Sequence, residues 1–441
     1  MEELVWRDPE EVWQAPEWLL TPAQRRRLKA LMVLVTVWTG VYLLHQFPVL
    51  RWGVVALSLL ILGYITWLFQ AESEATPTLT LSATGIPKVS LLIPAKNEAA
   101  VLPNVIASVA ALDYPQSHLD VWVIDDASTD ATPEVLADLQ RTYPWLQVHR
   151  RLPGSGGGKS GALNEVLPLT VGAVVAVFDA DARLPSDLLQ RALPLLQGGE
   201  KVGAVQVRKA IANATENAWT QGQAAEMILD AYLQQQRVAV GGFGELRGNG
   251  QLVHRSLLVG CGGWNESTVT DDLDLSFKLH LAGAEIAFLP DPPVYEEGVT
   301  GGIRLWHQRS RWAEGGYQRF LDYWPGMLGQ QLSPVKRLDL AVFFLNQYLL
   351  PMALVPDFLW AALMDHSPML WPLGVVAYLT IVWALWSGHR QVADRHGWAM
   401  VKVMLLTLVY MLHWVPVMIV TTARMCVQPK RLRWVKTDHK G

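Results

Sequence analysis

Apolar stretches at both ends of the chain constrain its fold more than any other feature. They bracket a segment between residues 88 and 335 that is rich in charged and turn residues. A bilayer core about 30 Å thick needs roughly 20 apolar residues per helix. The pattern therefore predicts an integral membrane protein, with a buried hairpin of a soluble protein as the alternative for the first two stretches. The stretches are Leu31–Phe47, Trp52–Phe69, Leu338–Met364, Leu370–Trp386 and Ala399–Val420.

Positive charge predicts how the chain is oriented in the membrane. Arg25, Arg26, Arg27 and Lys29 precede the first apolar stretch, and cytoplasmic flanks of spans carry an excess of such residues. We therefore expect the N-terminus and, after two crossings, the central segment to be cytoplasmic. The basic tail, Lys430–Lys436, lies on that side only if the number of crossings is even. We expect four spans, with one C-terminal stretch lying at the interface.

These expectations divide the chain into five parts. They are a cytoplasmic N-terminal segment (1–28), two transmembrane helices (29–70), a cytoplasmic polar domain (71–335), C-terminal transmembrane and interfacial helices (336–425) and a basic tail (426–441).

Composition excludes several classes of protein. The net charge of −4 offers no basic surface for nucleic acid, so we expect no nucleic-acid partner. The two cysteines, Cys261 and Cys426, lie far apart and outside any CxxC pattern. A disulfide framework or a structural zinc site is therefore not expected, and a reducing compartment fits.

Short apolar runs alternate with helix-forming segments in the first half of the polar domain. This alternation predicts an α/β sheet with right-handed crossovers, in which ligands bind at the carboxyl ends of the strands. The expected strands are Val89–Pro94, Val121–Ile124, Leu146–Arg150 and Val174–Phe178, and the expected helices are Asn97–Leu112, Ser128–Thr142 and Ala162–Leu167.

Two carboxylates follow the fourth expected strand directly, in Asp179-Ala180-Asp181. A hard cation such as Mg²⁺ or Mn²⁺ is commonly held by one or two carboxylates together with phosphate oxygens. An isolated DxD triplet is also common in solvated loops. Its place at the end of a buried strand favours a metal–diphosphate site built from Asp179 and Asp181.

Two further motifs have both a structural and a functional interpretation. Asp125-Asp126 follows the second expected strand, where it either stabilises a helix N-terminus through the helix dipole or contacts the base and ribose of a nucleotide. Lys159 lies in the glycine-rich run Gly156–Gly161, which departs from the spacing of a P-loop. That run is either a flexible surface loop or a device that brings a lysine to a diphosphate.

The last two motifs lie later in the domain. Thr270 to Asp274 precede an expected helix, so they either cap it or include a general base that takes a proton from an acceptor hydroxyl. The run Gln308–Trp312 either anchors the domain at the membrane interface or supplies ligands. In the second case Arg311 offers a bidentate fork to phosphate, and Trp312 offers a flat face to a sugar or a lipid glycerol.

The order and spacing of six motifs resemble the membrane-bound family 2 glycosyltransferases, over roughly residues 88–320. The motifs are AKNE (Ala95–Glu98), Asp125-Asp126, GGK (Gly157–Lys159), DAD (Asp179–Asp181), TDD (Thr270–Asp272) and QRSRW (Gln308–Trp312). The resemblance implies a GT-A domain inserted between N- and C-terminal transmembrane helices, and transfer with inversion by a single displacement.

The resemblance also implies roles for single residues. Asp126 and Lys159 would hold UDP, Asp179 the nucleotide diphosphate and Asp181 the metal, which we expect to be Mg²⁺ or Mn²⁺. Asp272 would be the general base, and Gln308, Arg311 and Trp312 would close over the diphosphate and the acceptor. Asp271, which we expect to bind substrate, stands where the family's polymerases usually have a glutamate.

Within the family, the chain is similar to cyanobacterial members that glucosylate a lipid. This similarity implies UDP-glucose as donor, 1,2-diacylglycerol in the bilayer as acceptor, and a plasma or thylakoid membrane location. The segments that carry it are Val202–Gln223, Gly244–Arg255, Cys261–Leu281, Gln308–Trp324 and Thr421–Lys436.

Two alternatives remain open from the sequence. A processive polysaccharide synthase of the poly-N-acetylglucosamine, cellulose or hyaluronan type would use the same donor site, but four or five apolar stretches leave little for a polymer channel. A degenerate member acting as a scaffold would have lost its carboxylates, whereas this chain retains them.

Overall fold

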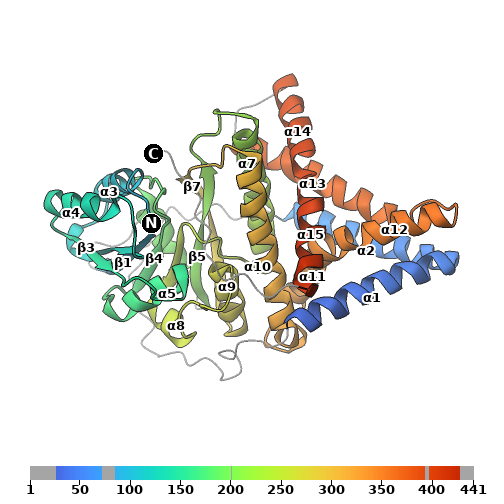
Figure 1. Cartoon of the computed structure of the whole chain (residues 1–441), viewed down its shortest axis with the longest axis horizontal. Coiled ribbons are helices and arrows are strands. Elements are labelled where there is room, and N and C mark those ends of the chain that lie inside the picture. Colours follow the sequence, from blue (N-terminus) through green and yellow to red (C-terminus); the bar gives the residue numbers. More distant parts are fainter. Residues whose placement is uncertain (1–25, 72–84, 200, 393–396, 428–441) are drawn as a thin grey trace.

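A mixed seven-stranded sheet forms the centre of the molecule (Figure 1). The computed structural model describes residues 26–71, 85–199, 201–392 and 397–427. Most of the expected N-terminal segment and nearly all of the basic tail lie outside these residues. The strand order is β3-β2-β1-β4-β6-β5-β7. The strands are β1 (Val89–Ala95), β2 (Leu119–Asp125), β3 (Leu146–Arg150), β4 (Val174–Val177), β5 (Val202–Ile211), β6 (Gln251–His254) and β7 (Glu285–Glu296).

The four strands predicted from the sequence are confirmed, and they are parallel to one another. Ala95 at the end of β1 pairs with Asp125 at the end of β2. The loops that carry the motif residues therefore leave the sheet at the same edge. The second half of the sheet was not predicted. There β6 runs antiparallel to both β4 and β5, and β7 pairs parallel to β5.

Helices cover both faces of the sheet. A hydrophobic core lies on each face of the sheet, and alternate side chains of β1 belong to different cores, because successive strand side chains point to opposite faces. Leu91 and Ile93 pack towards α3 (Leu102–Ala110) and α4 (Thr132–Thr142), whereas Leu92 packs towards α5 (Gly158–Val166) and α9 (Asp271–Leu281). Two shorter helices, α6 (Leu188–Ala192) and α8 (Arg255–Gly260), complete these layers.

All three expected helices begin at other residues. Helix α3 begins at Leu102 rather than at Asn97, whose backbone is left-handed with φ +56°. Helix α4 begins at Thr132 rather than at Ser128. Helix α5 begins at Gly158 rather than Ala162, so Lys159 lies in its first turn instead of in a loop.

Two long helices, α7 (Ala218–Ala239) and α10 (Gly302–Leu328), stand between the sheet and the apolar helices (Figure 1). Beyond them lie α1 (Arg26–Gln46), α2 (Arg51–Gln70), α11 (Pro334–Phe344), α12 (Leu350–Leu363), α13 (Trp371–Val392), α14 (Trp398–Met411) and α15 (Trp414–Val427). Pro351 and Pro356 do not interrupt the third apolar stretch, which is one helical unit from Pro334 to Leu363 with a π turn at Leu345–Leu349.

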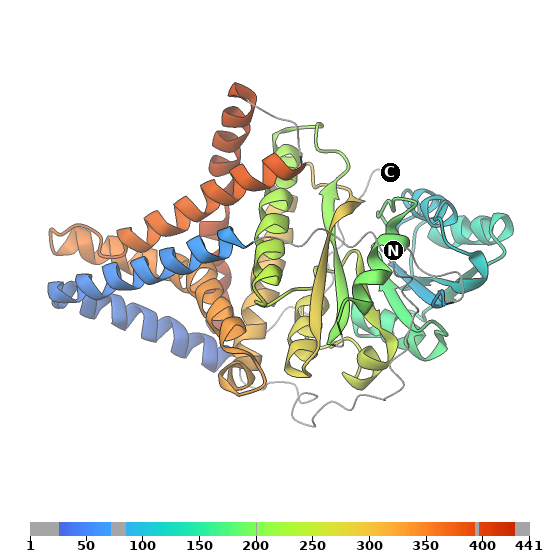
Figure 2. The same ribbon diagram turned by 180° about the vertical axis from the view of Figure 1, so that it is seen from behind.

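Among the described residues, five helical stretches are long and apolar enough to cross a membrane. The fifth, Met400–Val427, comprises most of α14 and all of α15. These two helices run alongside α7 and α10, crosswise to α1, α2 and α12 (Figures 1 and 2). At the start of α1, Arg26 pairs with Asp322 of α10, and the Lys29 amine donates to the Leu321 carbonyl at 2.8 Å. The basic end of α1 therefore lies on the side of the sheet domain.

Candidate active site

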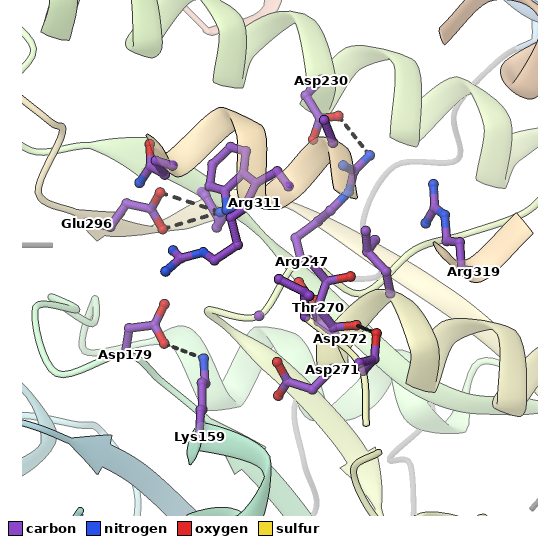
Figure 3. A pocket seen from close by; sticks show the side chains of 18 of the residues that line it. Lys159, Asp179, Asp230, Arg247, Thr270, Asp271, Asp272, Glu296, Arg311 and Arg319 are labelled. Atoms are coloured by element: carbon purple, nitrogen blue, oxygen red, sulfur yellow. Dashed lines mark hydrogen bonds and ion pairs between the residues drawn. The ribbon is translucent and has the colours of Figure 1, made fainter. Parts of the chain in front are cut away.

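One cavity of about 460 Å³ opens beyond the carboxyl end of β4, between the sheet and the apolar helices. Figure 3 shows its carboxylates and cations converging from α5, α7, α9, α10 and the strand ends. The cavity brings together eight residues that the sequence singled out: Lys159, Asp179, Asp181, Asp271, Asp272, Gln308, Arg311 and Trp312.

Lys159 and Asp179 form an ion pair across the cavity floor, with the amine 2.6 Å from the carboxylate (Figure 3). Burial would lower the pKa of Lys159, but the charges of Asp179 and Asp271 outweigh it and raise the pKa above its usual value. Gly157, in the left-handed region at φ +73°, makes the turn into α5. A Cβ there would lie 2.8 Å from the backbone Cα of Gly161, and the positive φ is itself strained for other residues, so glycine favours the turn that delivers this lysine.

Asp181 lines the same cavity as Asp179, and its carboxylate accepts the backbone N–H of Glu297 at 2.8 Å. No cluster of three or more His, Cys, Asp or Glu side chains suited to a metal occurs among the described residues. Two hard carboxylate ligands fit Mg²⁺ or Mn²⁺ provided that further oxygens come from a diphosphate.

Helix α9 presents two carboxylates to the cavity from its first turn. Burial and the charge of Asp271 raise the pKa of Asp272 to about 6. Burial raises the pKa of Asp271 as well. Thr270 occupies the N-cap position but makes no side-chain cap bond. Capping by Thr270 therefore does not explain this motif, and the shifted pKa of Asp272 suits a group that accepts a proton near neutral pH.

The third acidic residue of the motif is structural. Asp274 accepts bonds from Asn265 and from the Tyr323 hydroxyl, both at 2.9 Å, and it does not line the cavity. Of the three aspartates of α9's first turn, only Asp271 and Asp272 line the cavity.

The QRSRW motif lies within α10. Gln308, Arg311 and Trp312 line the cavity, and burial lowers the pKa of the Arg311 guanidinium. Arg309 points away from it, fully buried. Its guanidinium stacks on the Trp312 ring at 4.1 Å and pairs with Glu226 of α7 at 2.5 Å. Arg309 thus holds the helix in place, so that Gln308, Arg311 and Trp312 face the site.

Asp125 and Asp126 are not part of the cavity lining. Asp125 accepts the Ser128 backbone N–H at 2.9 Å, and Asp126 pairs with Lys96 at 2.9 Å and with Arg151. They organise the loop after β2 beside Glu98, which does line the cavity. A role in binding the nucleotide remains a prediction for both.

Several cavity residues were missed from the sequence. Lys209 of β5 and Glu296 of β7 pair at 3.4 Å, and Arg247 pairs with Asp230 of α7 at 2.8 Å. For Glu226 and Asp230, the i, i+4 spacing on one helix face was a signal in the sequence. Strands β5 and β7 come together with α7 only in the folded chain. The missed polar residues of the wall include Lys209, Glu226, Asp230, Arg247, Glu296 and Arg319.

The family model described as "Glycosyltransferase like family 2" matches residues 87–315, which contain every motif of this cavity. The chain belongs to glycosyltransferase family 2. It is therefore a glycosyltransferase, and the family resemblance of its motifs is confirmed.

Close relatives match over almost the whole chain. A β-monoglucosyldiacylglycerol synthase from Nostoc sp. is 49% identical, covering 95% of this chain and 90% of the relative. One of the same name from Synechocystis sp. is 48% identical, covering 95% and 89%. Among solved structures, a mannosyltransferase from Pyrobaculum calidifontis in complex with GDP-mannose and Mn²⁺ matches with a TM-score of 0.54 and 23% identity, covering 86% of this chain and 99% of that one. This structural likeness confirms the GT-A fold.

Proposed function

We propose that this protein transfers glucose from UDP-glucose to the free hydroxyl of 1,2-diacylglycerol in the bilayer, giving β-monoglucosyldiacylglycerol. The observation that carries the proposal is the extent of the cavity. The same space is lined by Lys159, Asp179 and Asp272 at one end and by Phe343 and Tyr348 of the apolar helices at the other. A donor site that opens among such helices suits an acceptor dissolved in lipid, in agreement with the names of the relatives.

The polar end is the proposed donor site. Asp179 and Asp181 would hold a divalent cation, Mg²⁺ or Mn²⁺, which when bound would neutralise charge on the diphosphate as it leaves. Lys159 and Arg311 would bind the diphosphate oxygens, because both cations line the cavity near Asp179. Gln308 and Trp312, on the same face of α10 as Arg311, would close over it.

Asp272 is the proposed general base. As the acceptor oxygen attacks the anomeric carbon, its proton passes to the Asp272 carboxylate while the bond from that carbon to the UDP oxygen breaks. Attack opposite the leaving group inverts the anomeric centre. Asp271 beside it, and the ion pair of Lys209 and Glu296, would position the sugar hydroxyls.

The directions of the helices support one arrangement in the membrane. We propose four spans, formed by α1, α2, the helix from Pro334 to Leu363, and α13, with α14 and α15 at the interface. The basic start of α1 and the tail would then lie with the catalytic domain in the cytoplasm. Either the plasma or the thylakoid membrane fits this arrangement.

A product assay tests the function. We would incubate purified full-length protein with UDP-[¹⁴C]glucose and 1,2-dioleoylglycerol in mixed micelles with Mg²⁺, then separate organic and aqueous phases. We expect label in an organic-phase monoglucosyl lipid with a β linkage. Label in an aqueous polymer would instead support a polysaccharide synthase, and the Asp272→Asn protein is the matched negative control.

A further inference from the structure

We propose that the membrane-facing arm of the cavity is a built acceptor subsite, in which Arg319 reads an ester carbonyl of the glycerolipid. The inference rests on the proposed function and deepens it by naming the residue that recognises the glycerol backbone. The ligand of this subsite would be a neutral glycerolipid with one free hydroxyl, adjacent ester groups and two acyl chains.

The arm changes character along its length. Near Asp272 the wall is polar, with Arg247 and its partner Asp230; farther on it is apolar. Figure 3 shows Asp179 on one side, Arg319 on the other, and Arg247 and Asp272 between them. The apolar part is supplied by α7, by α11 with its π turn, and by the junction of α14 and α15: Met227, Leu229, Leu233, Phe343, Tyr348, Met411 and Trp414.

Arg319 has hydrogen-bonding capacity to spare at the point where this change occurs. Its side chain is 3% exposed, and its Nη2 lies 3.0 Å from the buried carboxylate of Glu245. Its Nε and Nη1 atoms have no hydrogen-bond partner among the described residues, while the guanidinium lies over the Phe320 ring at 5.2 Å and interacts with the Tyr348 side chain. Leaving buried donors unsatisfied costs free energy, so such atoms on a cavity wall suit a ligand acceptor. An ester carbonyl oxygen accepts hydrogen bonds and cannot donate them, so it matches the N–H donors of Arg319.

The π turn contributes to the same wall. Gln347 and Tyr348, both within the π turn, line the cavity. Single π turns are frequent at functional sites. The acyl chains would pass between this turn, Leu233 of α7 and Met411 of α14, into the apolar layer.

The first test compares two acceptors with identical chains. Dioleoylglycerol carries ester carbonyls, whereas 1,2-di-O-oleylglycerol has ether links and lacks them. We expect kcat/KM to be about tenfold or more higher for the ester, because hydrogen bonds to charged groups are strong. In Arg319→Lys, which keeps a positive charge beside Glu245, this ratio should fall towards one while the KM for UDP-glucose changes less than about twofold. An unchanged ratio, or no ester preference in the wild type, would overturn the assignment.

A second variant keeps the proposal testable if Arg319→Lys does not fold. Leu233→Trp narrows the apolar arm, so we expect loss of transfer to dioleoylglycerol but retained transfer to dihexanoylglycerol. Leu169→Trp, which adds the same bulk at an exposed position, is the control. Equal loss with both acceptors, or equal activity with both, contradicts an acyl path here. If no lipid at all is glucosylated, the proposed function itself has failed, which is a different result.

Discussion

At the scale of single residues, Asp272 carries the sharpest prediction. Asp272→Asn keeps the shape of the side chain but removes its ability to accept a proton. We expect kcat to fall about 10²- to 10⁴-fold, the usual contribution of a general base. UDP-glucose binding, measured by calorimetry, should be nearly unchanged. Retained transfer with only a raised KM would remove Asp272 from this role.

The same carboxylate predicts a pH dependence. Its pKa is raised to about 6 by burial and by Asp271, and the base works only when deprotonated. The rate should therefore fall as pH drops through about 6 and level off above it. Because Asp271 and Asp272 interact, the profile of kcat/KM reports a property of the pair. In Asp271→Asn the acidic limb of the pH profile should move to lower pH. An unmoved limb would show that another group titrates there.

Asp181 predicts the metal dependence. Asp181→Ala removes one of the two proposed ligands and also the bond to the Glu297 N–H. We expect activity and Mg²⁺ or Mn²⁺ dependence to disappear together, and Mn²⁺ binding followed by electron paramagnetic resonance in the presence of UDP to weaken. Asp187→Ala, at an exposed acidic position, is the control. An active, metal-independent Asp181→Ala protein would contradict the assignment.

At the scale of elements, Glu226 joins four helices. From α7 it accepts bonds from Arg309 of α10, from the Tyr410 hydroxyl of α14 at 2.9 Å and from the Trp414 indole of α15 at 2.7 Å. Breaking a buried ion pair from one side costs about 3–5 kcal/mol. Glu226→Gln should therefore lower the thermal midpoint in detergent clearly, and Tyr410→Phe, losing one hydrogen bond, should lower it by much less. Equal midpoints for the two variants would show that the ion pair is not what stabilises the junction.

At the scale of the whole molecule, four spans predict which side each loop faces. The loop between α12 and α13 should lie across the membrane from the catalytic domain. Ser367→Cys places a label on that loop and Leu169→Cys places one on the catalytic domain, both in a Cys426→Ser background. In sealed vesicles of one orientation, a membrane-impermeant maleimide should label only one of the two. Labelling of both would place that loop on the catalytic side.

How much of this was predictable follows from the range of the interactions. The four parallel strands, the apolar helices and the aspartates after β4 are marked by local patterns, because a buried strand or a membrane helix needs a continuous apolar run whatever surrounds it. The start of α5 at Gly158 was missed because the left-handed backbone of Gly157 and its close approach to Gly161 are visible only in the folded chain.

By itself, then, the sequence determined the class of chemistry, since motif residues must be carboxylate or cationic to handle a metal and a diphosphate. Only the tertiary structure decided which of them meet. It separated Asp125 and Asp126 from the cavity, turned Arg309 away from it, and brought Arg247 and Arg319 into its wall beside residues of the membrane helices. The reason is physical: side-chain direction and burial depend on how distant elements pack, and no local pattern records that packing.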